Sequence, residues 1–252
     1  MHMATTKPTY PRLLFCFIAL LLLFSGCKKE EDRFPDHDLS PGASAEALVS
    51  GKIFKKLRLE ILHMPGHAPT AASIENINQF LNQYIDKPEG IQIQVRQIPS
   101  LNKDRYSISD LLELEQSHRA EWNQKADMSL CIILVDGDFS ESNRVLGVAY
   151  RNTSMALFQK KVQQFSGGLT QPPRTILESS IFLHELGHVF GLVNNGAPMQ
   201  QNHHDEANGK HCSNSDCLMY FAVETTDFAA NLLGGSIPAL DANCGNDLNA
   251  LK

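Results

Sequence analysis

From about residue 53, hydrophobic and polar residues recur with two different periods, which predicts a chain of alternating strands and helices. Strict alternation predicts half-buried strands, and a continuous apolar run predicts a strand that is covered on both faces. Apolar residues spaced three or four positions apart predict helices. The strands expected on these grounds are 56–64, 90–98, 129–137, 144–150 and 154–158, and the helices are 72–86 and 107–124.

This order of elements predicts an α/β fold with a mixed sheet. Crossover helices join parallel neighbours, whereas the last two strands are close enough along the chain to pair as a hairpin. The chain has 252 residues, of which 42% are hydrophobic, and we expect one globular domain of this composition. A Gly- and Pro-rich loop follows the last strand, at 163–174.

A further helix is expected after this loop. Thr175 and Glu178 have the spacing of a capping box, and Gly191 is a natural C-terminal stop because the left-handed conformation costs glycine no steric strain. The apolar residues that would anchor this helix in the core are Ile181, Phe182, Leu186, Val189 and Phe190. Beyond Gly191 the apolar period fades, so 192–252 is expected to be rich in loops, with one helix at 223–233.

The first 27 residues have the features of a secretory signal. Two basic residues precede a continuous apolar run at 13–24, which is too short to span a bilayer comfortably, and small residues precede Cys27. The ending Ser25-Gly26-Cys27 resembles a bacterial lipobox, which implies that Cys27 becomes the acylated first residue of the mature protein. A plain cleaved signal and an uncleaved anchor are the alternatives.

The segment 28–52 is polar, charged and without an apolar period, so we expect a flexible tether. The folded domain is then expected at 53–252. Together these features predict an exported monomer that is lipid-anchored to the bacterial outer membrane, in the periplasm or at the cell surface. The formal net charge of −6 offers no basic excess, which makes nucleic acid an improbable partner.

The sequence His-Glu-Leu-Gly-His at 184–188 is the candidate for chemistry. Histidines four residues apart lie on the same side of a helix, so His184 and His188 can each direct a ring nitrogen at one metal ion. Glu185 lies beside that face and can take a proton from a water molecule that zinc has activated. The structural alternative is a buried helix with two incidental histidines.

Catalytic zinc sites nearly always have a third protein ligand. The run from His184 to Gly191 resembles the metzincins, in which a third histidine follows three residues after the glycine, but that position holds Asn194. Further on, His211-Cys212-x4-Cys217-x-Met219 resembles the archaemetzincin family, whose pattern runs H-E-x-x-H-x-x-G-x-x-H-C-x4-C-x-M. The resemblance implies an insertion of 17 residues, His211 as the displaced third ligand and Met219 as the methionine of the Met-turn.

The resemblance further implies a metzincin-like mixed sheet with an active-site helix, divided into an upper subdomain at 53–191 and a small, irregular lower subdomain at 192–252. In that family the cysteines serve a second zinc, but its later C-x-x-C has only Cys244 here. A disulfide between Cys212 and Cys217 is the alternative in an exported protein, and the pairing of Cys131 and Cys244 stays open. Phe221 stands where some metzincins carry a tyrosine.

Other residues compete for the third ligand position. The inserted stretch "NHHDE" contains His203, His204 and Asp205, which could ligate zinc, bind a second ion or lie in a solvated loop. Asn194 is a poorer alternative because an amide oxygen binds zinc weakly. Glu206 or Glu224 could supply the glutamate ligand of the other large clan of zinc peptidases.

The function predicted from these residues is a zinc-dependent metalloendopeptidase that hydrolyses protein or peptide substrates. The sheet edge near 144–158 is expected to pair with an extended substrate. The rival hypothesis is a non-catalytic surface binding lipoprotein on a zinc-peptidase scaffold. Glu185 argues against it, because a structural zinc site has no need of a base at that position.

Overall fold

The computed structural model describes residues 1–4, 36–232 and 235–252. The chain divides into a unit at 1–33 and a unit at 34–252, and the description below concerns the second. The signal at 1–27 and its Cys27 fall almost entirely outside the described residues. Within the described residues, no helix has the length and the apolar character that crossing a membrane requires.

A five-stranded mixed sheet forms the centre of the fold, with the strand order β2-β1-β4-β7-β6. The strands β2, β1, β4 and β7 are parallel to one another, and β6 is antiparallel to β7, which confirms the predicted mixed sheet. The bounds are β1 Lys56–His63, β2 Ile91–Gln97, β4 Asp127–Val135, β6 Gly147–Arg151 and β7 Ser154–Phe158. A separate parallel pair consists of β3 Arg105–Tyr106 and β5 Asp138–Phe139.

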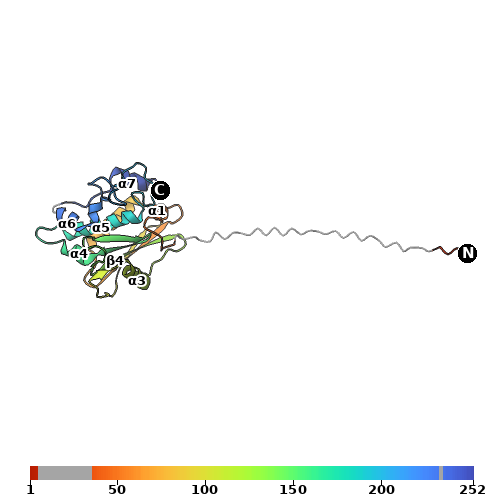
Figure 1. Cartoon of the computed structure of the whole chain (residues 1–252), viewed down its shortest axis with the longest axis horizontal. Helices are drawn as coiled ribbons and strands as arrows, with labels where there is room; N and C mark the ends of the chain where they lie inside the picture. Colours follow the sequence, from red (N-terminus) through yellow and green to blue (C-terminus); the bar gives the residue numbers. More distant parts are fainter. Residues whose placement is uncertain (5–35, 233–234) are drawn as a thin grey trace. The chain divides into compact units, whose positions relative to one another are not determined.

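The helices cover both faces of the sheet (Figure 1). Their bounds are α1 Ala45–Val49, α2 Ala71–Tyr84, α3 Ile108–His118, α4 Gln159–Gln164, α5 Arg174–Val189, α6 Thr226–Asn231, α7 Ala242–Asn249 and the 3₁₀ helix η1 Phe221–Glu224. The larger hydrophobic cluster includes α2 and α5, and the smaller one includes α3. Leu130 and Ile132 of β4 face the first cluster while Cys131 and Ile133 face the second, which explains the continuous apolar run.

The segment predicted to be a tether ends earlier than residue 53. The helix α1 lies within it, and Leu48 and Val49 are fully buried in the larger cluster. The side-chain amide of Asn152 donates hydrogen bonds to the Asp36 carbonyl at 2.6 Å and to the Ser44 hydroxyl at 2.7 Å. The fold therefore includes the chain from residue 36 onward, through contacts with distant residues that no local apolar period announces.

The start of α5 also differs from the prediction. Pro173 occupies the cap position, and no side-chain cap bond forms, so the capping box of Thr175 and Glu178 is absent. Instead Glu178 accepts a hydrogen bond from the backbone N–H of Thr70 at 2.9 Å and pairs with Arg174 at 3.0 Å. The buried carboxylate of Glu178 thus joins the beginnings of α2 and α5, a tertiary contact that replaced the local one.

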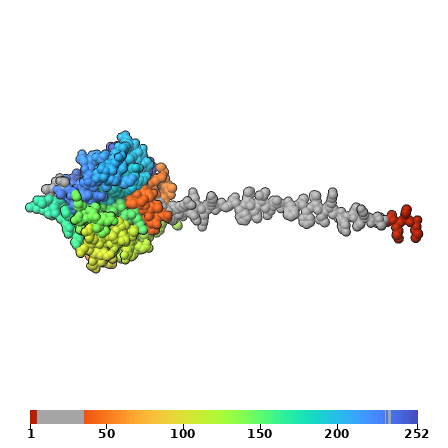
Figure 2. Space-filling view, viewed as in Figure 1, coloured from red at the N-terminus to blue at the C-terminus, as the bar shows by residue number. Residues whose placement is uncertain are grey.

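The C-terminal part packs around the end of α5. Gly191 adopts a φ of 78° directly after the helix, as predicted for its C-terminal stop. A side chain there would collide with the backbone of Ala197 and with Ala45 of α1, so the turn is also tightly packed. Figure 2 shows the residues that follow α5, in blue, gathered on one side of this unit. The helix expected at 223–233 is shorter, since η1 and α6 share that stretch.

Candidate metal centre

The helix α5 supplies the first three side chains of the site. His184, Glu185 and His188 are all buried, and the Nε2 atoms of the two histidines lie 3.1 Å apart. This closeness follows from the helical repeat, because residues four apart lie one above the other on a single face. Buried apolar side chains on both sides of the motif pack α5 into the larger hydrophobic cluster, and this packing fixes the positions of the two imidazoles.

His211 brings a third imidazole from a segment distant in sequence. Its ring centroid lies 5.2 Å from that of His184 and 4.9 Å from that of His188. The Nδ1 atom of His211 donates a hydrogen bond to the carbonyl of Asn208 at 2.5 Å, while the Nδ1 atom of His184 donates to the carbonyl of Leu218 at 2.7 Å. These bonds leave the Nε2 lone pair of each ring available to a metal ion.

The electrostatics favour neutral imidazoles. Burial, followed by the neighbouring His211, lowers the pKa of His184 to about 3. Burial likewise lowers the pKa of His188 and of His211. The three rings are therefore uncharged near neutral pH, and only the neutral form of histidine has the lone pair with which it binds a metal.

Glu224 completes the group from the end of η1. Its Oε2 atom lies 3.8 Å from the Nε2 atom of His184 and 4.0 Å from that of His211. Together with His188, these residues form a group whose ligand atoms all lie within 4.8 Å of one another. Burial raises the pKa of Glu224 to about 7. The backbone carbonyl of Glu224 accepts a hydrogen bond from Leu146, next to β6, at 2.7 Å.

Glu185 lies in this cluster without a hydrogen-bond partner for either carboxylate oxygen, among the residues that the structure describes. Burial, and then the charge of Glu224, raises the pKa of Glu185 well above its ordinary value. The Nε2 atom of His211 is also buried and unpartnered. Such orphaned groups cost about 1–3 kcal/mol each, so their gathering at one point fits a site built for a zinc ion and a water molecule.

Met219 packs beneath the helix at the level of the motif. It is fully buried, and an ideal β-carbon on Gly187 would lie 2.2 Å from its Sδ atom. Gly187 lies one residue before His188, so the methionine side chain fills the space that any other residue type at 187 would occupy. The sequence predicted Met219 at this place through the family pattern alone.

An open cleft of about 270 Å³ gives access to the cluster. It is lined by Ser40, Pro41, Val148, Ala149, Glu185, His188, Asn195, Lys210 and Glu224. The strand β6, which contributes Val148 and Ala149, is an edge strand of the sheet and is antiparallel to its neighbour. Ser40 and Pro41 lie within the predicted tether, and no feature of the sequence indicates their place at the cleft.

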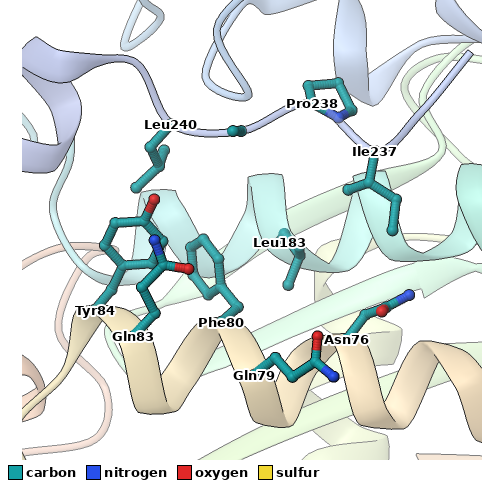
Figure 3. A pocket seen from close by; sticks show the side chains of 10 residues that line it. Asn76, Gln79, Phe80, Gln83, Tyr84, Leu183, Ile237, Pro238 and Leu240 are labelled. Atoms are coloured by element: carbon teal, nitrogen blue, oxygen red, sulfur yellow. The ribbon is translucent and has the colours of Figure 1, made fainter.

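A second groove lies away from the cluster, between α2 and residues 237–240 (Figure 3). It is lined by Asn76, Gln79, Phe80, Gln83, Tyr84, Leu183, Ile237, Pro238, Ala239 and Leu240. These side chains include no carboxylate, histidine or cysteine. The groove therefore has no group suited to bind a metal ion or to transfer a proton near neutral pH.

The structure sorts the other candidates for a third ligand. Asn194 and Glu206 are exposed, and His204 donates a hydrogen bond from its ring to the carbonyl of Gly209. His203 is buried in a different cluster, with Cys212, Asp241 and Cys244. Of the proposed alternatives, only Glu224 lies beside the two helix histidines and His211.

The four described cysteines, Cys131, Cys212, Cys217 and Cys244, are free and buried. The structure thus differs from the disulfide alternative for Cys212 and Cys217. The Sγ atoms of Cys217 and Cys244 lie 3.6 Å apart. Cys131 is on β4, where burial raises the pKa of its thiol, and its side chain belongs to the smaller hydrophobic cluster.

Comparison with known proteins decides the family. The family model of the M12 metallopeptidases (Reprolysin_5, "Metallo-peptidase family M12") matches residues 63–230, which include the helix histidines, His211 and Glu224. The chain belongs to metallopeptidase family M12. This M12 metallopeptidase is therefore a peptidase of the zinc-dependent class, and protein or peptide is its substrate. No curated protein matches its sequence significantly.

Two solved structures are similar to this chain. Archaemetzincin from Methanopyrus kandleri is 18% identical to this M12 metallopeptidase, with a TM-score of 0.52, and the match covers 78% of this chain and 96% of the other. Metalloproteinase-II from Bacteroides fragilis is 13% identical, with a TM-score of 0.45, over 87% of this chain and 58% of the other. The first match confirms the expected archaemetzincin-like fold.

Proposed function

We propose that this M12 metallopeptidase is a zinc-dependent endopeptidase in which His184, His188 and His211 hold the zinc ion and Glu185 is the general base. The support is the convergence of three buried, neutral imidazoles whose free ring nitrogens meet beside that carboxylate. Three protein ligands with an open fourth position are characteristic of catalytic rather than structural zinc.

A zinc ion held by His184, His188 and His211 would act as a Lewis acid, polarising the substrate carbonyl and lowering the pKa of a water molecule toward ~7. Glu185 would accept a proton from a water molecule that attacks the carbonyl carbon of the substrate. Glu185 then delivers the proton to the nitrogen of the leaving amine, which prevents the peptide bond from re-forming. Nearby positive charge stabilises the ionised form of a carboxylate, so a bound zinc ion would counteract the effect of burial on the pKa of Glu185.

The strongest support is the buried carboxylate of Glu185: neither oxygen makes a hydrogen bond in the described part of the chain, and the nearby backbone of Ala149 offsets only part of the rise in its pKa. In a helix with a purely structural role, a carboxylate would have hydrogen-bond partners or would lie at the surface. Its place at the floor of the cleft, next to His188, provides the geometry that a general base needs.

We assign the third ligand to His211 rather than to Glu224. The Nε2 atom of His211 is buried and unpartnered, and the bond from its Nδ1 atom to Asn208 orients the ring. Glu224 reaches the same space but lines the cleft, where it can face the substrate. Met219 provides the apolar support beneath the helix.

We propose that an extended peptide binds along β6. An edge strand offers free backbone groups, and Val148 and Ala149 of β6 line the cleft beside Glu185. A peptide that pairs with this edge strand would run past Glu185 and extend beyond the cleaved bond in both directions. This mode of binding suits cleavage within a peptide rather than at its end.

The direct test is Glu185→Gln, which keeps the size of the side chain and removes the base. The variant should retain zinc and lose at least about 100-fold in kcat on a broad peptide library. Glu206→Gln is the matched control, because Glu206 is exposed, and it should be fully active. Retained hydrolysis in Glu185→Gln would contradict the proposed base.

The same experiment addresses the rival function. A wild-type protein that binds zinc and peptides but cleaves none of them would favour a non-catalytic binding lipoprotein. In that case Glu185→Gln should leave peptide binding unchanged and there should be no activity to lose.

We further propose that Cys27 carries the lipid anchor and that the mature protein is exported to the outer membrane. The apolar run at 13–24 and the Ser25-Gly26-Cys27 ending support this proposal. Intact-mass analysis of the membrane fraction should show a mature chain that begins at Cys27 with acyl mass added. Cys27→Ser should remove the added mass and release the protein from the membrane.

A further inference from the structure

The segment 36–44, called the strap below, borders the cleft that leads to Glu185. Ser40 and Pro41 of the strap line this cleft together with Val148 and Ala149 of β6. The strap precedes α1 and contains no helix or strand of its own. Its position beside the cleft therefore depends on individual contacts with the rest of the fold.

Asn152 makes three of these contacts. It is fully buried in the turn between β6 and β7. Its side-chain amide donates to the carbonyl of Asp36 at 2.6 Å and to the hydroxyl of Ser44 at 2.7 Å, and its backbone N–H donates to the carbonyl of Leu39 at 2.9 Å. One residue at the end of β6 thus binds the beginning, the middle and the end of the strap.

A tight turn at 40–43 presents Pro41 to the cleft. The backbone N–H of Ala43 donates to the carbonyl of Ser40 at 3.1 Å, and Gly42 has a φ of 81°. Proline at the second position and glycine with positive φ at the third position are the preferences of a type II turn. The ring of proline fixes its own φ, so this wall of the cleft is rigid.

The turn also packs against the backbone that continues from α5. A β-carbon on Gly42 would lie 1.6 Å from the carbonyl oxygen of Asn195 and 2.9 Å from the Cα atom of Gly191. The side-chain amide of Asn195 donates to the carbonyl of His188 at 3.2 Å. The position of the strap is therefore fixed relative to the helix that carries the site.

The strap also limits the free edge of β6. Before this strand, the backbone N–H of Leu146 donates to the carbonyl of Glu224 at 2.7 Å, and after it Asn152 donates to Leu39. Between these bonds lies β6, Gly147–Arg151, which within the described residues pairs only with β7. An added strand can pair with these 5 residues and no more.

We propose that the strap limits the substrate on one side of the cleaved bond to about three residues paired with β6, a span of ~10 Å in an extended chain. The general base marks the other end of this span, because a β-carbon on Gly147 would lie 2.8 Å from the Oε1 atom of Glu185 and Ala149 lines the cleft beside it. Asn152, which holds the strap, follows Ala149 by three positions. The proposal rests on the proposed binding of peptides along β6.

An irregularity in β6 supports the same limit. The pairing of β6 with β7 shifts register between Ala149 and Arg151, and such bulges commonly end regular pairing. A peptide that is longer on this side must turn away from the sheet at Ser40 and Pro41. The preferred substrates are therefore peptides, or exposed ends and loops of proteins, whose extended stretch is short on the side of the strap.

The test is a set of peptides with one cleavage site, lengthened by one residue at a time on either side. For the wild type, kcat/KM should rise with length and become constant after about three residues on one side only. Gly42→Ala displaces the strap through the collision with Asn195. It should raise kcat/KM for the longer peptides, relative to the shortest, by about threefold or more, mainly through a lower KM, because further backbone hydrogen bonds become available.

Gly66→Ala is the matched control for Gly42→Ala. Gly66 has a φ of 80°, so alanine is equally strained there, but a β-carbon would meet nothing within 4 Å. Gly66 does not line the cleft. This variant should keep the wild-type dependence of kcat/KM on peptide length.

Ser40→Trp tests the same wall without a change in the core, because Ser40 is exposed. The larger side chain should lower kcat/KM by about tenfold more for the longest peptides than for the shortest, through the loss of one or two backbone hydrogen bonds. Should the protein cleave no peptide, the catalytic proposal is wrong, and the Kd of the same peptides for Glu185→Gln then provides the length dependence.

Two results would overturn the role of the strap. One is a wild type whose kcat/KM or peptide affinity continues to rise equally on both sides beyond the expected length. The other is a length dependence that neither Gly42→Ala nor Ser40→Trp alters.

Discussion

Gly187 and Met219 are in direct contact across two segments of the fold: a β-carbon on Gly187 would lie 2.2 Å from the Sδ atom of Met219. The glycine lies between the two helix histidines, and the methionine follows His211 by eight positions along the turn. The contact joins the part of the site that the helix provides to the part that the C-terminal region provides. A β-carbon at this position, where helix propensity alone would favour alanine, fits only if the Met219 side chain moves.

Gly187→Ala should destabilise the protein. Helix propensity favours alanine by ~1 kcal/mol, but forcing a methyl group into a packed interior typically costs about 1–3 kcal/mol, and Met219 is fully buried and has little room to move. The net loss should appear as a melting temperature lower by several degrees, at about 2–4 °C per kcal/mol for a chain of this size.

Gly245→Ala is the matched control for that change. Gly245 is within the helix α7, and a β-carbon there would meet nothing within 4 Å. This variant should be more stable by up to ~1 kcal/mol. Equal melting temperatures for the two variants would show that the contact with Met219 is unimportant.

Gly147→Ala should slow the reaction without removing zinc. A β-carbon at this first residue of β6 would lie 2.8 Å from the Oε1 atom of Glu185 and 2.6 Å from the side chain of Ile181. The methyl group must displace the general base, so we expect kcat to fall by tenfold or more, which is about 1.4 kcal/mol. Unchanged kcat with an unchanged zinc content would show that the position of Glu185 tolerates this shift.

Glu224→Gln should move the acid limb of the pH–rate profile to lower pH. Burial and then the charge of Glu224 raise the pKa of Glu185, so removing that charge makes ionisation of Glu185 easier. The base is then ionised at a lower pH, and activity persists further into acid. The measurement is kcat/KM against pH for the wild type and the variant, and a shift toward higher pH would contradict the assignment.

His211→Ala should lose the catalytic zinc, whereas Asn194→Ala should not. The unpartnered ring nitrogen of His211 faces the helix histidines, while Asn194 is exposed. The zinc content of the two variants after dialysis is the measurement, and activity should follow it. Zinc retained by His211→Ala but lost from Asn194→Ala would contradict the assignment of His211 as the third ligand and, with it, the inferred 17-residue insertion.

The sequence specified those parts of the site that lie within one helix. The spacing of His184 and His188 and the stop at Gly191 depend only on the helical repeat and on local backbone freedom, and the structure has all three in the expected places. The sheet could also be predicted from the sequence, because the continuous apolar run of β4 indicates a strand that is covered on both faces. Residue types and their period are sufficient for such features.

Features that depend on contacts between residues distant in the chain could not be predicted from the sequence. The capping box of Thr175 and Glu178 has the right spacing, yet Glu178 bonds Thr70, which is more than a hundred positions away. Helix α1 offers only a few apolar residues, and their burial needs the assembled core. No local rule could have distinguished either case from its alternative.

The inserted stretch illustrates the same limit at the chemical level. A solvated loop was a reasonable expectation for two adjacent histidines, and His204 has one exposed hydrogen bond in keeping with it. His203 instead lies between Cys212 and Asp247, which only the fold brings together. His211 was predicted from the spacing pattern of a similar family. The helical repeat gives no indication of it, because 23 positions separate it from His188.

The zinc site beside α5 is tested most directly by a crystal structure with anomalous diffraction at the zinc absorption edge. We expect an anomalous peak about 2.0–2.1 Å from the Nε2 atoms of His184, His188 and His211, with Glu185 beside it and unbound to the ion. A peak held by the two helix histidines and Glu224 with His211 turned away, or no zinc beside α5, would contradict it.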